Sequence, residues 1–230
     1  MAEGAKTIFV AGTGTGVGKT FVCGLLLRFA RQRCNAGYQK WVSTGGEMPE
    51  DWRFCRETAG LSLDMAVLGR EVPFRFIYPA SPHLAAEREG REVDPQVIVD
   101  RYHEMAAAHE LLIVEGAGGL LVPLRRDLLL VDLLARLAPP TLLVAKSGLG
   151  TINHTLLSLE ALRSRNIPVL GVVFSDGSED AGDEELVNDN MRVVAEVGQC
   201  RVFGRLPRCR DLAEAAAAFA PIGEALIAAL

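Results

Sequence analysis

Short apolar runs rich in β-branched residues alternate along this 230-residue chain with longer stretches of helical periodicity. The apolar runs predict strands at 8–11, 37–42, 111–114, 141–145, 169–174 and 201–204. The periodic stretches predict helices at 21–30, 50–59, 83–89, 95–109, 128–137, 153–165, 183–197 and 211–229. Short apolar strands that alternate with helices are typical of an α/β fold, in which a mostly parallel sheet carries helices on both faces.

No change in composition marks a boundary between two domains. Residues 176–185 are acidic and contain glycine, which a surface loop explains as well as a linker does. The length suits one large domain or two small ones, and the 49% of hydrophobic residues allow a sizeable core. We expect a single domain over residues 1–230, with ligands bound beyond the carboxyl ends of the strands.

The charge and the cysteines narrow the class of protein. The formal net charge is −5, and no basic stripe or row of aromatic residues indicates a nucleic-acid partner. No apolar run is long enough to span a membrane, and no segment near the N-terminus resembles a signal peptide. Five cysteines without a C-x-x-C pair indicate reduced thiols. These features favour a cytoplasmic enzyme that binds neither nucleic acid nor membrane.

The first predicted strand runs directly into Gly12-Thr13-Gly14-Thr15-Gly16-Val17-Gly18-Lys19-Thr20, and a helix follows. This context is typical of a phosphate loop, whose backbone N–H groups and helix N-terminus bind phosphates. Thr13 stands where the strict pattern G-x-x-x-x-G-K-[ST] has its first glycine. Lys19 would reach the β- and γ-phosphates, and the Thr20 hydroxyl would hold Mg²⁺. Packing alone gives no reason for Gly-Lys-Thr at the start of a helix.

A carboxylate follows the strand predicted at 111–114. Glu115 directly precedes Gly116-Ala117-Gly118-Gly119. At this edge of a parallel sheet it would face the phosphate loop, where it could hold Mg²⁺ directly or through water. The alternative is a loop carboxylate that only caps the backbone. The small residues that follow favour the first interpretation, because they permit close approach of a ligand.

Other polar residues have a less specific context. Lys40 could bind an anionic substrate group at the end of the second strand, but taken alone a solvated surface lysine is the better interpretation. Asp51 begins a predicted helix, where aspartate is usually just a favourable charge at the helix dipole. Ser81-Pro82-His83 favours a proline-fixed turn, since no G-x-S-x-G occurs, and His154 favours a structural role at a helix start.

Six stretches, taken together and in order, resemble the dethiobiotin synthetase family. They are the phosphate loop, Lys40 with Thr44-Gly45, Ser81-Pro82-His83, Val114-Glu115-Gly116-Ala117-Gly118-Gly119, Gly150-x-Ile152-Asn153-His154, and Gly204-x-Leu206-Pro207. The resemblance runs from about residue 7 to 208. It implies a P-loop NTPase-like α/β domain that works as a homodimer. It also implies a ligase that uses ATP and Mg²⁺ to join CO₂ to 7,8-diaminononanoate, through a phosphorylated carbamate, in biotin biosynthesis.

The resemblance also implies roles for individual residues. Lys19 and Lys40 would act on the reacting groups. Mg²⁺ would be held by Thr20, Asp51 and Glu115. The substrate would contact Lys40, Thr44 and, across the dimer interface, Gly150, Thr151, Ile152 and Asn153. The nucleotide would contact Gly16, Val17, Gly18, Lys19, Thr20, Phe21, Glu115, Gly116, Ala117, Gly118, Ser175, Asp176, Leu206, Pro207 and Arg208.

The chain departs from the family pattern at three positions. Gly14 stands where the family often has Asp, and Trp41 replaces the proline that usually follows the second-strand lysine, which leaves the placement of Lys40 open. Ser175 occupies the position of an asparagine that reads the base. A hydroxyl cannot supply both the donor and the acceptor of a carboxamide, so the base preference is also open.

The competing interpretation is a ParA/MinD-like nucleotide-dependent dimerisation switch. Such ATPases also have a variant phosphate loop, but they usually carry a second lysine at the position of Gly14 and often end in a basic amphipathic segment. Here residues 211–230 are rich in alanine, and their only charges are acidic. A relative of the cobyrinate synthetases would need a glutaminase domain, for which this chain is too short. We therefore expect the ligase.

Overall fold

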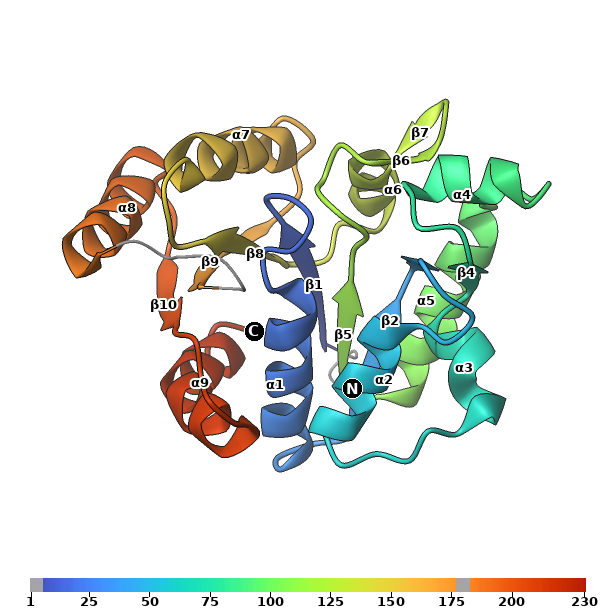
Figure 1. Cartoon of the computed structure of the whole chain (residues 1–230), viewed down its shortest axis with the longest axis horizontal. Helices are drawn as coiled ribbons and strands as arrows, with labels where there is room; N and C mark the ends of the chain where they lie inside the picture. The colour runs from blue at the N-terminus through green and yellow to red at the C-terminus, as the bar shows by residue number, and fades with distance from the viewer. Residues whose placement is uncertain (1–5, 177–182) are drawn as a thin grey trace, which may run out of the picture.

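The computed structural model describes residues 6–176 and 183–230. Its main sheet has six strands, and every neighbouring pair is parallel (Figure 1). In sheet order the strands are β10 (Val202–Leu206), β9 (Val169–Ser175), β8 (Thr141–Lys146), β1 (Lys6–Gly12), β5 (Leu111–Glu115) and β2 (Ala36–Lys40). The predicted α/β fold with a parallel sheet is confirmed.

Helices cover both faces of this sheet, because successive strand residues point to opposite sides. In β1, Ile8 and Val10 belong to one buried hydrophobic cluster, whereas Phe9 and Ala11 belong to the other. The first cluster packs against helices that lie side by side in Figure 1, namely α1 (Lys19–Arg31), α2 (Glu50–Thr58) and α9 (Leu212–Ile227). The second packs against α5 (Pro95–Ala108), α6 (Leu130–Leu137), α7 (Thr151–Arg163) and α8 (Glu184–Val197).

Several short elements extend the predicted pattern. Strand β3 (Val42–Thr44) pairs with β4 (Phe74–Phe76), and β6 (Pro123–Arg125) pairs with β7 (Leu128–Leu129). The helix predicted at 128–137 therefore begins only at residue 130, because the two residues before it form strand pairs. Two short helices complete the set, α3 (Met65–Glu71) and α4 (Pro82–Arg88), the latter close to the prediction at 83–89.

The strand predicted at 37–42 is two strands, with Trp41 between them. The backbone N–H of Trp41 donates to the carbonyl of Glu115 at 3.4 Å, a bond that proline could not form. The buried indole packs on Phe9, with ring centroids 4.7 Å apart. Lys40 remains paired with Glu115 at the end of β2, so the tryptophan leaves the lysine at the carboxyl edge of the sheet.

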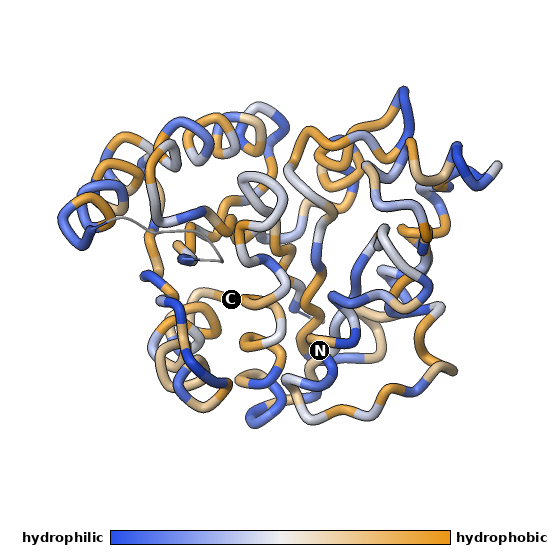
Figure 2. The backbone as a smooth tube through the Cα atoms, viewed as in Figure 1, coloured by the Kyte–Doolittle hydropathy of each residue, from blue (hydrophilic) through white to orange (hydrophobic). Residues whose placement is uncertain are grey.

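Figure 2 shows hydrophobic residues concentrated in the strands and on the helices that cover them, while the tip of the β6–β7 hairpin is hydrophilic. Within the described part of the chain, no helix has the length and apolar character needed to cross a membrane. Residues 177–182 of the predicted acidic loop at 176–185 lie outside the described residues, so that prediction is not tested.

Candidate active site

The glycine-rich loop joins β1 to α1 in a conformation that depends on its glycines. Gly16 and Gly18 have φ values of 72° and 94°, in the left-handed region that favours glycine, and α1 begins at Lys19. The Lys19 side chain folds back, and its Nζ donates to the carbonyl of Gly14 at 2.8 Å. A Cβ atom on Gly12 would lie 2.8 Å from that Nζ. Gly12 therefore makes room for the lysine, although it precedes the position of the first glycine in the strict pattern.

The Lys19 ammonium is poised to accept an anion. The residue is only 6% exposed, and no carboxylate lies within salt-bridge distance of it among the described residues. Burial, followed by the nearby positive charge of Lys40, lowers the pKa of Lys19 to about 8. A phosphate group would stabilise the charged form, since an opposite charge raises the pKa of an amine.

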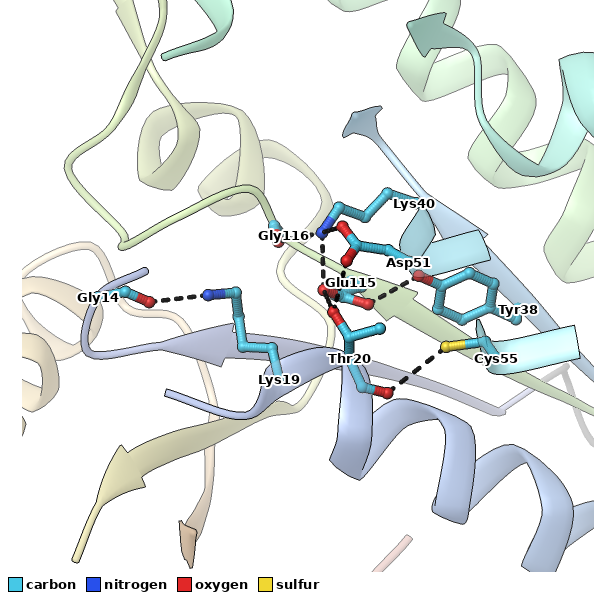
Figure 3. Close-up of polar contacts among 9 residues, drawn as sticks. All are labelled: Gly14, Lys19, Thr20, Tyr38, Lys40, Asp51, Cys55, Glu115 and Gly116. Atoms are coloured by element: carbon cyan, nitrogen blue, oxygen red, sulfur yellow. Dashed lines mark hydrogen bonds and ion pairs between the residues drawn. The ribbon is translucent and has the colours of Figure 1, made fainter. Parts of the chain in front are cut away.

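Beside the loop, four polar side chains meet at the carboxyl ends of β2 and β5 (Figure 3). Thr20 Oγ1 lies 2.9 Å from Asp51 Oδ1 and 2.8 Å from Glu115 Oε1. Lys40 Nζ lies 2.7 Å from Asp51 Oδ2 and 2.7 Å from Glu115 Oε1. The two carboxylates and the hydroxyl offer oxygen ligands of the kind that Mg²⁺ prefers, and both carboxylates lie within hydrogen-bond distance of the hydroxyl.

The charges in this cluster stabilise one another. Burial alone would lower the pKa of Lys40, but the Glu115 and Asp51 carboxylates outweigh it and raise that pKa above its ordinary value. Burial would raise the pKa of Asp51, but Lys40 lowers it below the ordinary value. Lys40 is thus a buried ammonium in an ion-pair network, and the interpretation as a solvated surface lysine is wrong. Asp51 is likewise more than a charge at the start of α2.

One residue of the cluster escaped the sequence analysis. The Tyr38 hydroxyl donates to Glu115 Oε2 at 2.7 Å. Tyr38 is 2% exposed, and burial raises its pKa well above the ordinary value, so the phenol keeps its proton. The available signal was its position two residues before Lys40 in the same strand, which places both side chains on one face of the sheet.

A cavity of about 790 Å³ opens in front of this cluster. Half of the predicted site residues line it: Gly16, Gly18, Lys19, Thr20, Phe21, Lys40, Thr44, Asp51, Glu115, Ala117 and Gly118. Ser81 also lines it, and its hydroxyl lies 3.1 Å from Nδ1 of His83. Val17 is buried below the loop, and Gly116 lies against Phe9, where a Cβ atom would approach the ring to 2.9 Å.

Five further predicted nucleotide contacts lie at the ends of β9 and β10. Ser175 is buried against the phosphate loop, since a Cβ atom on Gly18 would lie 2.5 Å from its Oγ. Arg205 binds both oxygens of Asp176 at 2.8 and 2.9 Å, and the backbone N–H of Arg208 donates to one of them at 3.3 Å. Leu206 ends β10, and Pro207 follows. Ser175 thus lies beside the loop, but none of these five residues lines the cavity.

The residues predicted to bind substrate at 150–153 do not line the cavity either. Gly150, with φ of 86°, is the N-cap of α7, and Leu149 before it is 89% exposed. Thr151 is buried, with its hydroxyl 3.4 Å from that of Thr155. A single chain therefore does not bring this turn to the remainder of the predicted site.

Comparison with known proteins identifies the family of this chain. The AAA domain family matches residues 6–216. The ATP-dependent dethiobiotin synthetase BioD of Rhodopseudomonas palustris strain TIE-1 is 43% identical over 93% of this chain and 92% of its own length. The chain belongs to the dethiobiotin synthetase family. Another member, from Chlorobaculum tepidum, is 40% identical over 88% of this chain and 85% of its own length. The resemblance drawn from the six sequence stretches is confirmed.

Solved structures that are distant in sequence share the fold of this dethiobiotin synthetase family member. Apo McdA of Cyanothece matches with a TM-score of 0.61 at 14% identity, covering 98% of this chain and 99% of its own. A ParA family ATPase from Chlorobium tepidum matches with a TM-score of 0.54 at 14% identity, covering 96% and 92%. At such identities the likeness concerns the P-loop NTPase fold alone and lends no support to the dimerisation switch.

Proposed function

We propose that the protein is an ATP-dependent dethiobiotin synthetase, which closes the cyclic urea of dethiobiotin from 7,8-diaminononanoate and CO₂. The observation that carries this proposal is the second lysine. Lys40 stands with Thr44 in the same cavity as the phosphate loop, so the cavity can hold two anionic groups close together. A switch ATPase needs only the first of them. Membership of the synthetase family supports a carbamate as the second anionic group.

Lys19 and the loop amides of residues 16–21 would bind the nucleotide phosphates, with help from residues 116–118. Ser175, Asp176 and residues 206–208 would surround the base, because Ser175 lies against the same loop and the others lie with it at the ends of β9 and β10. Thr20, Asp51 and Glu115 fit Mg²⁺ in their chemistry and mutual proximity. When bound, the ion would neutralise charge on the phosphates during transfer.

The reaction then follows from charge and position. One amine of the substrate attacks CO₂ and loses a proton, which leaves a carbamate anion. A carbamate oxygen attacks the γ-phosphorus, and ADP leaves. The second amine attacks the carbonyl carbon, loses a proton and expels phosphate, which takes up that proton, and the ring closes. Lys19 and Lys40 would offset the repulsion between carbamate and triphosphate, and Thr44 would help to orient the carbamate. Exclusion of water would protect the phosphorylated carbamate from hydrolysis.

We further propose that the protein is a single domain over residues 1–230, acts in the cytoplasm and forms a homodimer. The support for the dimer is the turn at Leu149 and Gly150, where the leucine is exposed and neither residue lines the cavity. The backbone amides at the start of α7 would receive the carboxylate of a substrate bound to the partner chain, since helix N-termini favour anions. Each complete site would then contain residues of both chains.

Phosphate release in CO₂-depleted buffer tests the proposed function. Turnover should be low with ATP and Mg²⁺ alone, remain low when 7,8-diaminononanoate is added, and rise when bicarbonate is restored. Phosphate and cyclic urea should then appear in equal amounts. A protein that hydrolyses ATP at the same rate whether or not the diamine and CO₂ are present is not this ligase, and that behaviour would favour the switch.

A further inference from the structure

The Glu115 side chain is completely buried, and both oxygens of its carboxylate have hydrogen-bond partners. Oε1 faces Thr20 and Lys40 on the cavity side. Oε2 accepts the hydrogen bond from the Tyr38 hydroxyl at 2.7 Å. Figure 3 shows the Tyr38 and Lys40 side chains reaching this carboxylate from strand β2. The lysine contacts the oxygen that faces the site, whereas the tyrosine contacts the other.

The sheet register places Tyr38 there. Strands β2 and β5 are parallel, with Lys40 opposite Glu115 and Tyr38 opposite Ile113. Residues two apart in a strand point to the same face, so Tyr38 lies beside Lys40, one step further from the sheet edge. Its ring is held in the hydrophobic cluster under α1 and α2. A ring fixed by packing gives its hydroxyl a fixed direction, as a supporting group for a binding site requires.

We propose that Tyr38 is a positioning residue: its hydroxyl holds Glu115 Oε2, so that Oε1 is presented to Thr20 and to a metal–nucleotide complex. Without this bond the carboxylate could turn about its terminal torsion, which has broad minima. Mutation of a group that hydrogen-bonds to a metal-binding side chain typically lowers metal affinity or activity 10- to 100-fold. The inference rests on the proposed function only in that Glu115 serves the metal–nucleotide complex.

The test is metal binding without turnover. Mn²⁺ affinity is measured by electron paramagnetic resonance in the presence of a non-hydrolysable ATP analogue. Tyr38→Phe should weaken Mn²⁺ binding by about tenfold or more. The matched control is Tyr102→Phe, which removes the same hydroxyl from a buried tyrosine on α5, on the opposite face of the sheet, and should leave the affinity unchanged. Equal effects of the two substitutions, or no effect of the first, would overturn the proposal.

A double-mutant cycle tests whether Tyr38 acts through Glu115. In a Glu115→Gln background, Tyr38→Phe should cause little further loss of Mn²⁺ affinity, whereas an undiminished second loss would contradict the proposal. If the Tyr38→Phe variant does not fold, a separate test uses the wild-type sequence. The three tyrosines are replaced by fluorotyrosine and observed by fluorine NMR. The Tyr38 resonance should shift on addition of Mg²⁺ and the non-hydrolysable ATP analogue, whereas the Tyr102 resonance should not. A stationary Tyr38 resonance would refute the role.

These readouts separate the two proposals. If the wild-type protein binds Mn²⁺ with nucleotide but releases no phosphate with the diamine and CO₂, the proposed function fails and the role of Tyr38 can still be measured. If the protein is an active ligase and Tyr38→Phe leaves Mn²⁺ affinity unchanged, the positioning role fails alone.

Discussion

Replacement of Lys40 by methionine should lower both the stability and the activity of this protein, and Mg²⁺ should restore only the stability. Lys40 Nζ lies 2.7 Å from one oxygen of each of two carboxylates, Asp51 and Glu115. Removal of one partner from a buried ion pair costs about 3–5 kcal/mol of unfolding free energy. The Asp51 side chain is 36% exposed and its pair is partly screened, so we expect the lower end, about 3 kcal/mol.

For a chain of this length, that loss corresponds to a decrease in melting temperature of about 6–12 °C. Urea unfolding followed by circular dichroism gives the free energy directly. Lys6→Met is the matched control, because Lys6 is an exposed lysine at the start of β1 and its replacement should change stability by less than about 0.5 kcal/mol.

Magnesium provides the decisive comparison. Without the ammonium, the two carboxylates are free to bind a cation, so Mg²⁺ should stabilise the Lys40→Met variant more than it stabilises the wild type, at about 2.7 kcal/mol for a concentration of 100 Kd. Phosphate release should be abolished in this variant and should not return with Mg²⁺, because the ion restores charge but not the lysine that we propose contacts the substrate. A loss of stability below about 1 kcal/mol, or an equal effect of Mg²⁺ on both proteins, would refute the buried network.

Three further outcomes are expected. Nucleotide affinity without metal should fall as the pH rises from about 7 to about 9, because the pKa of Lys19 is lowered to about 8 and only its charged form attracts phosphate. Titration calorimetry that gave the same affinity across this range would contradict the prediction. Mixing Lys19→Ala with Asn153→Asp, whose added negative charge would repel the substrate carboxylate at the start of α7, should restore roughly a quarter of wild-type activity if each site of a symmetric dimer combines both chains, and no recovery would exclude shared sites. Ser175 should relax base selectivity, so that competition assays give ATP less than about a hundredfold advantage over CTP or GTP.

The pH dependence of stability has a defined sign at the cluster. The pKa of Asp51 is lowered in the folded protein, so its contribution is present above the unfolded value of 3.8 and is lost as the pH falls below it. The pKa of Lys40 is raised, so its contribution is complete below the unfolded value of 10.5 and is lost only at more alkaline pH. The network is therefore intact across the neutral range.

Most of the main sheet could be predicted from the sequence because β1, β5, β8 and β9 are largely apolar on both faces and helical stretches lie between the strands. The short strands β3 and β7 could not. They have three and two residues, and a run such as 128–131, apolar at every position, gives no period that separates strand from helix. Only the partner strands β4 and β6 determine where the chain is extended.

The residues of the candidate site also differ in how far the sequence alone predicts them. Lys19, Thr20 and Glu115 have local signals, namely a glycine-rich turn or a strand end followed by small residues. Lys40 and Asp51 have none, because a lysine at a strand end and an aspartate at a helix start are common on protein surfaces. Their role depends on the parallel register of β2 with β5 and on the packing of α2 against α1, which are long-range contacts.

The two tryptophans have a practical consequence. Trp41 directly follows Lys40, Trp52 directly follows Asp51, and the sequence contains no other tryptophan. Both indoles are fully buried. All of the tryptophan emission of the protein therefore originates next to the two charged side chains that a ligand would engage. A ligand that draws on Lys40 or Asp51 changes the electric field at an adjacent indole, so the protein carries an intrinsic optical probe of its own binding site and needs no attached dye.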